Sequence, residues 1–206
     1  LHEALDLIRA HYAGAGYHHI DLKVAMKSLS HDTTALTLTI NAQHKTKISS
    51  IDIKGNHAFS RASILGHWLM APTRFWSFFT GSNVYTEAKW HHDLEATRQF
   101  YRNRGFVDMQ INDSQAVFSS DKQSVGLTVS LKEGAQYHLK SYKILGLNQV
   151  QKKAMRLHLT ALHAGMVYRE DDIKALVVQI KKQLSDWGFI ETNVNVLTQV
   201  DHKKHT

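Results

Sequence analysis

A glycine followed by an aromatic residue occurs three times in this chain, at Gly16, Gly105 and Gly188, and limits the folds open to it. At 15, 11, 8 and 4 residues before each glycine the side chains are apolar in eleven of twelve cases, with Thr97 as the exception. Steps of four, three and four place these side chains on one face of an α-helix. Each segment is therefore predicted to be an amphipathic helix that ends at its glycine, because glycine adopts the left-handed conformation without a steric penalty.

Extended segments with alternating apolar residues follow each predicted helix. Residues 21–26 and 35–40 are predicted to form two strands joined by a turn, and residues 107–117 and 125–131 to form a second hairpin. The apolar residues of segment 190–196 predict a further strand after the third helix. Each copy is therefore predicted to be a helix followed by extended chain.

A second shared element precedes the second and third helices. Residues 48–56 and 139–147 each form a short alternating segment that ends in a glycine turn. A helical segment follows each turn, at residues 60–70 and at about residues 148–159, and Ser60 is a suitable N-cap. The recurring unit is therefore strand, helix, helix, strand, strand.

Composition indicates a folded chain and excludes several kinds of site. The 206 residues suffice for one large domain or two to three small ones, and 43% are hydrophobic and 21% charged. No apolar run approaches the roughly 20 residues of a membrane-spanning helix, so we expect any export signal to have been removed or to lie outside these residues. Because there is no cysteine, disulfides and thiolate chemistry are excluded.

Enzymatic chemistry has no support in the sequence. No nucleophile elbow, phosphate-binding glycine loop or zinc-protease motif is present, and Asp93 and Glu95 are expected on a solvated helix face. The 15 histidines lack the convergent spacing of a zinc site, so we expect neither a metal nor a cofactor. The net charge of +7 favours acidic partners, such as an anionic membrane surface, to which histidine protonation would strengthen binding.

Three segments in fixed order resemble the POTRA domains, the polypeptide-transport-associated modules of the Omp85 family of outer-membrane protein assembly factors in Gram-negative bacteria. They are "IDIKGNHAF", which opens a unit, "DLEATRQFYRNRGF", which closes its second helix, and "VSLKEG", which ends its last strand. The resemblance is strongest for the central unit, which is similar to the third POTRA domain of such factors. The flanking segments are similar to the end of the second and most of the fourth.

The resemblance implies an α+β fold of tandem βααββ modules, each with a three-stranded mixed sheet and two helices on one face. Residues 1–47 would be the C-terminal part of one domain, residues 48–135 a complete domain, and residues 136–206 a domain without its last strand. It further implies a non-enzymatic, periplasmic part of an outer-membrane protein whose barrel is not in this sequence. Its implied partners are unfolded outer-membrane β-barrel proteins and accessory lipoproteins.

An edge strand is the predicted peptide-binding site. A three-stranded sheet leaves at least one edge with unpaired backbone groups, to which an extended peptide can add as a further strand. The resemblance implies that the exposed edge is the second strand of the complete domain. The predicted edge residues are Val107, Asp108, Met109, Gln110, Ile111, Asn112, Ser114, Ala116 and Val117.

Two other groups of residues are candidate contact sites. The segment "TRFWSFFTG" concentrates aromatic side chains in a loop, where they would either cover the core of their own domain or contact a lipoprotein, a neighbouring domain or the membrane. These residues are Phe75, Trp76, Phe78 and Phe79. Residues at the glycine turns are candidates for contacts between domains, with a plain turn as the alternative; they are Gly55, Asn56, His57 and Gly146.

A second function class stays open at the level of sequence. A basic array of small α/β domains could bind nucleic acid, with the aromatic loop stacking on bases. A gel-shift titration separates the two functions, because electrostatic nucleic-acid binding weakens steeply with salt. The resemblance favours the scaffold function without nucleic acid.

Overall fold

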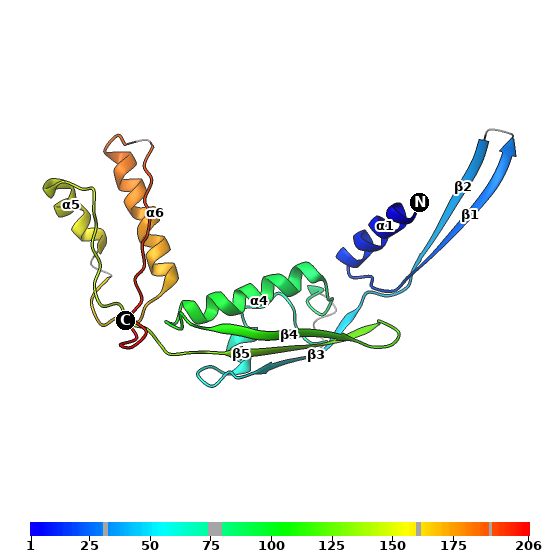
Figure 1. Ribbon diagram of the computed structural model, residues 1–206, viewed down its shortest axis with the longest axis horizontal. Helices are drawn as coiled ribbons and strands as arrows, with labels where there is room; N and C mark the ends of the chain where they lie inside the picture. The colour runs from blue at the N-terminus through cyan, green and yellow to red at the C-terminus, as the bar shows by residue number, and fades with distance from the viewer. Residues whose placement is uncertain (31–32, 74–79, 160–161, 190) are drawn as a thin grey trace. The chain divides into compact units, whose positions relative to one another are not determined.

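The computed structural model describes residues 1–30, 33–73, 80–159, 162–189 and 191–206. The chain forms two compact units, one of residues 1–97 and 111–131 and the other of residues 98–110 and 132–206. The division into three sequence modules remains a prediction. The described elements (Figure 1) are α1 (His2–Gly14), β1 (Ile20–Ser30), β2 (Thr33–Ala42), β3 (Lys47–Lys54), α2 (Arg61–Leu65), α4 (Glu87–Arg102), β4 (Gln110–Phe118), β5 (Ser124–Lys132), α5 (Gln149–Leu159) and α6 (Glu170–Asp186).

The three repeated helices and their glycine stops are confirmed. Gly16, Gly105 and Gly188 follow α1, α4 and α6 with φ of +95°, +87° and +88°. In all three copies the amide of the following aromatic residue donates to the carbonyl five residues earlier, which is the long bond of a Schellman motif. These bonds join Tyr17 to Tyr12 (2.9 Å), Phe106 to Tyr101 (3.1 Å) and Phe189 to Leu184 (3.0 Å).

A three-stranded mixed sheet forms the centre of the first unit, with strand order β3-β5-β4. The strands β3 and β5 are parallel, and β4 is joined to β5 by a short hairpin turn (Figure 1). Alternate residues of β5 are buried, as the period of a strand with one covered face requires. They are Val125, Leu127, Val129 and Leu131, and Ile48, Ile51 and Ile53 of β3 join them in the core.

The helix after Ser60 is shorter than predicted. Ser60 caps it as expected, because its hydroxyl accepts the Ser63 amide at 3.2 Å, but α2 ends at Leu65 rather than at Met70. The amides of Leu69 and Met70 donate instead to the two carboxylate oxygens of Asp93, at 2.7 and 3.0 Å. A tertiary acceptor thus replaces the helical carbonyls and ends the helix early.

The solvated position predicted for Asp93 is wrong, because its side chain is fully buried in the first unit. Thr97, the single polar residue at the repeat positions, lies in the same part of α4. Thr97 is also buried, accepts the indole N–H of Trp68 at 2.8 Å and donates to the Asp93 carbonyl at 2.9 Å. Both polar side chains are therefore interior groups with satisfied hydrogen bonds.

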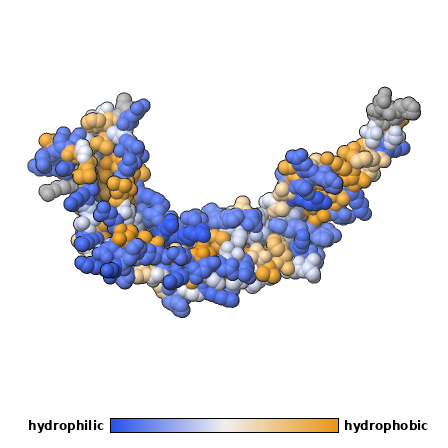
Figure 2. All heavy atoms as spheres, in the orientation of Figure 1, coloured by the Kyte–Doolittle hydropathy of each residue, from blue (hydrophilic) through white to orange (hydrophobic). Residues whose placement is uncertain are grey.

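The first repeat forms an antiparallel two-stranded sheet of β1 and β2, as predicted. Both strands are longer than expected, and their register runs from Ile20 opposite Ala42 to Ser30 opposite Thr33. Figure 2 shows hydrophobic residues over much of the visible face of this hairpin. The large exposed hydrophobic side chains of the hairpin include Met26, Leu29, Leu36 and Ile40.

The third repeat keeps its helices but not its strands. The helix α5 begins with a reciprocal capping box, in which Asn148 and Gln151 each accept the other's backbone amide at 2.9 Å. The described residues of the predicted strands 139–147 and 190–196 form no strand. In the three-stranded sheet β5 pairs with both β3 and β4, whereas no described strand pairs with either of these two segments. Ile144, Leu147 and Val194 pack instead against Met155, Ile180 and Leu184.

Within the described ranges, none of the helices combines the length and hydrophobicity that crossing a bilayer requires.

Candidate peptide-binding edge and the repeated junction

The strand β4 is an edge of the three-stranded sheet, with β5 as its neighbour. Most of its side chains are exposed or half-buried, and Val117 is 64% exposed. Among the described residues, no backbone hydrogen bond leaves β4 except toward β5. The outer backbone groups of β4 are therefore available to a further strand.

The opposite edge of the sheet is partly covered. The Ile48 amide of β3 donates to the Asn83 carbonyl at 2.8 Å, and the Ile48 carbonyl accepts the Thr73 amide at 3.0 Å. Lys47 of β3 also forms an isolated bridge with Val84. Own-chain segments thus occupy the start of β3, which leaves β4 as the more open edge.

The edge strand begins three residues later than predicted. Val107 and Asp108 form a turn and Met109 precedes the strand, so these three predicted edge residues lie outside β4. The Met109 side chain is buried, and its amide donates to the Phe106 carbonyl at 3.3 Å. Apolar alternation continues through this turn, which is why the sequence pattern placed the strand start too early. The other predicted residues lie within β4: Gln110, Ile111, Asn112, Ser114, Ala116 and Val117.

Asp108 anchors this turn within the second unit. Its carboxylate accepts the Tyr137 hydroxyl at 2.5 Å and lies 3.2 Å from Nδ1 of His202. The hydrogen bond from Tyr137, together with His202, lowers the pKa of Asp108, and the same bond raises the pKa of Tyr137 to about 12. The turn is therefore fixed by tertiary contacts rather than by its own sequence.

One backbone arrangement, termed the junction, is built twice. In the first unit the Gly16 carbonyl accepts the Thr46 amide at 2.8 Å, and the Thr46 carbonyl accepts the Tyr85 amide at 3.0 Å. The second unit repeats it with Gly105, Tyr137 and Tyr168, at 2.8 and 2.9 Å. The repeated helix stop thus also positions the chain that follows. The related segments "NVYTEA" and "MVYRED" are the sequence signal that reveals this arrangement.

The predicted interdomain residues lie outside these two junctions. At Gly55, φ is +86° and an added Cβ would lie 2.0 Å from the Leu131 carbonyl oxygen, so the turn packs tightly against the end of β5. The Asn56 amide group donates to the Phe59 carbonyl at 2.9 Å. Around Gly146 an added Cβ would meet open space. A role between domains for these residues and His57 remains a prediction.

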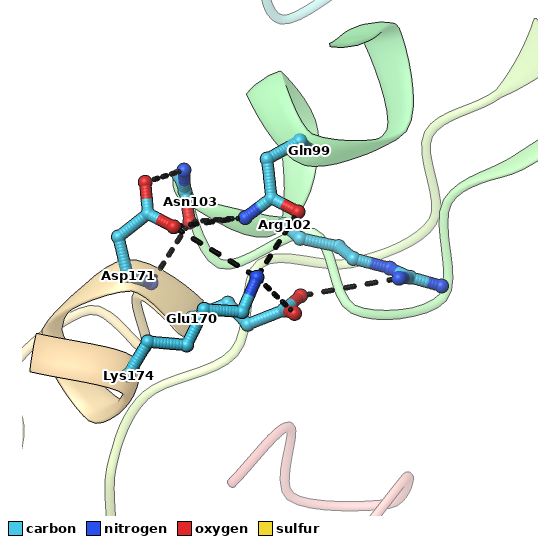
Figure 3. A network of polar contacts seen from close by, with 6 residues as sticks. All are labelled: Gln99, Arg102, Asn103, Glu170, Asp171 and Lys174. Atoms are coloured by element: carbon cyan, nitrogen blue, oxygen red, sulfur yellow. Dashed lines mark hydrogen bonds and ion pairs between the residues drawn. The ribbon is translucent and has the colours of Figure 1, made fainter. Parts of the chain in front are cut away.

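Side chains reinforce the second junction (Figure 3). The side-chain oxygen of Asn103, in the turn after α4, accepts the Asp171 backbone amide at 3.0 Å and so caps α6, while the Asn103 side-chain amide group donates to the Asp171 carboxylate. The Gln99 amide group donates to the same carboxylate at 3.0 Å. The ion pairs in this network are Lys174 with Glu170 at 2.9 Å, Arg102 with Glu170 at 3.9 Å and Lys174 with Asp171 at 4.0 Å.

The first junction has small residues at the matching positions. Counting from the repeated glycine, Gly14 stands where the second copy has Asn103, and Ala10 stands where it has Gln99. Aligning the two related segments places Ala88 at the position of Asp171. None of these side chains can form the polar network, so the two junctions share a backbone pattern but differ in the side chains that hold it.

His18 forms the side-chain contacts of the first junction. Its Nδ1 lies 3.1 Å from the Thr46 hydroxyl, which itself donates to the Lys122 carbonyl at 2.6 Å. The imidazole ring centre lies 5.2 Å from those of both Tyr85 and Phe118. Because the Thr46 proton points to Lys122, the neutral His18 ring must carry its proton on Nδ1. Burial is the main cause that lowers the pKa of His18 below its usual 6.5.

We expect His18 to make the first unit less stable in mild acid. The unfolded chain takes up the His18 proton near pH 6.5, whereas the folded chain resists it, so the free energy of unfolding falls as the pH drops below 6.5. Urea denaturation measures the free energy of unfolding at about pH 7.5 and about pH 5.5. Between these two pH values, His18→Gln should lose less of this free energy than the parent chain. The exposed neighbour provides the control, because His19→Gln should keep the parental loss. Equal losses in all three proteins would contradict the assignment to His18.

Two further predictions concern the aromatic segment and metal binding. The aromatic residues Phe75, Trp76, Phe78 and Phe79 lie outside the described residues. In the part of the chain that the structure describes, no three His, Asp or Glu side chains are grouped so that they could hold a metal ion.

Comparison with known proteins finds a POTRA match and BamA relatives. The POTRA family model, described as a surface antigen variable number repeat, matches residues 46–134. The outer membrane protein assembly factor BamA of Buchnera aphidicola subsp. Acyrthosiphon pisum (strain APS) is 28% identical over 199 residues, which cover 97% of this chain and 32% of that protein. BamA of Neisseria meningitidis serogroup B (strain ATCC BAA-335 / MC58) is 24% identical over 197 residues, which cover 95% of this chain and 25% of that protein.

A solved structure agrees with this assignment. The crystal structure of Haemophilus influenzae BamA POTRA3-5 matches with a TM-score of 0.62 and 26% identity, covering 78% of this chain and 62% of that one. The chain spans about a third or less of the length of the two BamA relatives. The expected α+β fold with a mixed three-stranded sheet is confirmed, and the match is to a non-enzymatic region of an assembly factor. Residues 46–134 match the POTRA family, and the chain is homologous to the POTRA region of the outer membrane protein assembly factor BamA.

Proposed function

We propose that this chain is part of the periplasmic region of a BamA-type assembly factor, in which the β4 edge binds extended segments of unfolded outer-membrane proteins. The observation that carries this proposal is the position of β4 at the open edge of the sheet, with its outer backbone groups unpaired by described residues. Homology to BamA supports the setting in outer-membrane protein assembly.

Pairing through the backbone suits this class of client. Backbone hydrogen bonds do not depend on side-chain identity, so one edge can accept many sequences. Proteins that will become β-barrels are rich in alternating strands, which can add to β4 while their other edge is still unpaired. A single added strand gives weak binding, which permits release to the next step of assembly.

Accessory lipoproteins and the membrane surface are the other proposed partners. We assign lipoprotein docking to the segment that contains Phe75, Trp76, Phe78 and Phe79, because its sequence concentrates aromatic residues, which are enriched at protein interfaces. The net charge of +7 supports a weaker attraction to anionic lipid head groups.

Peptide titration tests the proposed edge. An amphipathic strand peptide from an outer-membrane protein should shift the backbone amide signals of residues 110–118 in NMR spectra, because these amides and their neighbours gain a strand partner. A photoreactive residue in place of Gln110 should crosslink the same clients in cells.

The other edge supplies the control for both measurements. Asp52 is exposed on β3, and a photoreactive residue there should crosslink clients much less. Amide shifts confined to β3 or to the helices would contradict the assignment of β4 as the binding edge.

A further inference from the structure

The positive charge of the chain is concentrated in one stretch of the second unit. Residues 134–169 contain no aspartate or glutamate, although the whole chain has 18 acidic residues. They contain six lysine or arginine residues and thus supply +6 of the formal net charge of +7. These residues are Lys140, Lys143, Lys152, Lys153, Arg156 and Arg169. Such a local field of one sign attracts an acidic partner to this part of the chain rather than to the molecule as a whole.

The turn that leads into α5 presents apolar side chains beside two of these lysines. Ile144 and Leu147 pack inward against the buried Met155 of α5. Leu145 and Val150 point outward instead, and their side chains are 84% and 78% exposed. The helical spacing of three residues places Lys153 on the same face of α5 as Val150. The outward residues, termed the turn surface, are Lys143, Leu145, Val150 and Lys153, and all four are exposed.

The turn surface is held in place by the backbone of its own segment. Asn148 and Gln151 cap the start of α5 reciprocally at 2.9 Å, and Gly146 turns the chain with φ of +84°. Among the described residues, none forms an ion pair or a side-chain hydrogen bond with Lys143 or Lys153. A partner therefore meets a preformed surface whose charges are not neutralised by the chain itself.

These features fit an acidic segment of a protein better than other anionic partners. A membrane-bound helix turns its apolar face outward, whereas α5 turns its own, with Met155, toward the core. A nucleic acid offers phosphates to the lysines, but its phosphate backbone offers nothing apolar to Leu145 and Val150. A polypeptide can supply carboxylates and an aliphatic side chain together.

We propose that the turn surface docks an acidic segment of a partner protein, with carboxylates paired to Lys143 and Lys153 and an apolar side chain packed on Leu145 and Val150. The surface uses no residue of β4, so this inference goes beyond the proposed function. The acid-free stretch speeds the encounter, because complementary charge raises association rates. Exposed charge pairs add only modest affinity, so the docking is reversible.

A helical peptide with glutamates on both sides of a central leucine tests the proposal on the 206-residue chain. Because the peptide is helical, it presents no strand to β4. We expect it to shift the backbone amide signals of residues 143–153 in NMR spectra. Fluorescence anisotropy should show about tenfold weaker binding to Lys153→Glu, which corresponds to about 1.4 kcal/mol, because like charges replace an attractive pair.

The adjacent lysine supplies a matched control. Lys152 is also exposed, but neighbours on a helix point about 100° apart, so its side chain leaves the face that carries Val150 and Lys153. Lys152→Glu changes the net charge equally and should weaken binding less than about twofold. Neither variant should unfold α5, because negative charge is favourable in the N-terminal part of a helix.

A second variant tests the apolar half of the surface. Leu145→Ser should weaken binding of the peptide that carries leucine but not of the same peptide with serine in its place, because only the first has an apolar contact to lose. Leu145 is exposed, so this substitution leaves the core intact.

The other outcomes would overturn the proposal. Equal weakening by Lys152→Glu and Lys153→Glu would show that the peptide responds to overall charge and not to the turn surface. If phosphatidylglycerol vesicles or a short duplex DNA bind through Lys153 while the peptide shifts no amide of residues 143–153, that other partner replaces the protein segment. Amide shifts confined to residues 110–118 would place the peptide on β4, which contradicts the turn surface and leaves the proposed function standing.

Discussion

Replacing Asp93 with alanine should lower the free energy of unfolding of the first unit by about 3 kcal/mol. The Asp93 carboxylate is fully buried and accepts the amides of Leu69 and Met70, which lie just after α2. Its loss leaves these donors without a partner, and an unsatisfied buried donor costs about 1–3 kcal/mol. Trp68 and Trp90 lie close together nearby, so tryptophan fluorescence during urea denaturation reports the change.

The same helix provides the control for this experiment. Glu95→Ala removes the same charge from an exposed position two residues away, and we expect a loss below about 1 kcal/mol. Asp93→Asn keeps one acceptor oxygen and should fall between the two. A loss for Asp93→Ala no larger than that for Glu95→Ala would contradict the structural role of Asp93.

Gly105→Ala should destabilise the second unit by about 3 kcal/mol, against about 1 kcal/mol for Gly188→Ala. Both glycines end a repeated helix at nearly the same φ, +87° and +88°, so the backbone cost of a Cβ is the same. At Gly105, however, the new Cβ would lie 2.9 Å from the Tyr137 carbonyl oxygen and 2.8 Å from a Val167 methyl group. At Gly188 it would meet nothing within 4 Å.

Thermal or urea denaturation of the two variants measures this difference directly. The two positions share the substitution, the unit and the helix-stop geometry, so the excess loss at Gly105 reports the junction alone. Equal losses of unfolding free energy in Gly105→Ala and Gly188→Ala would contradict this prediction. They would show that the junction can open by a few tenths of an ångström without cost. Gly16, with Val84 Cγ1 2.6 Å from an added Cβ, provides the matching position in the first junction.

Local sequence patterns predicted most of the helices and strands. Helical spacing and the glycine stops located α1, α4 and α6, because a helix satisfies its own backbone groups and its apolar face repeats regularly. Alternation likewise located β1, β2 and β5. For the candidate site, alternation predicted a strand from Val107 to Val117, of which Gln110 to Val117 lie in β4, and the resemblance to known domains predicted that this strand is an edge.

What the sequence did not predict depends on contacts between distant residues. Asp93 has the spacing of a surface carboxylate, and nothing near it in the sequence shows that the amides of Leu69 and Met70 will reach it. Segments 139–147 and 190–196 have strand alternation, but a strand also needs a partner, which the described residues do not supply. A pocket lined by Phe118 combines residues of α1, the segment that follows it, β1, β4 and the β4–β5 turn, so no single motif carries it.

The place of β5 in the sheet has a consequence for how the central module is made. The strand β5 is the last of the three in the chain but the middle one in space, and Ile51 of β3 pairs with Leu127. A ribosome or a translocation channel releases the N-terminal part first, so β3 must wait for some 70 residues before its partner emerges. During that delay β3 has no strand partner and its apolar side chains stay exposed, so chaperones can bind it. The module can therefore complete its sheet only late, once its final strand has been delivered.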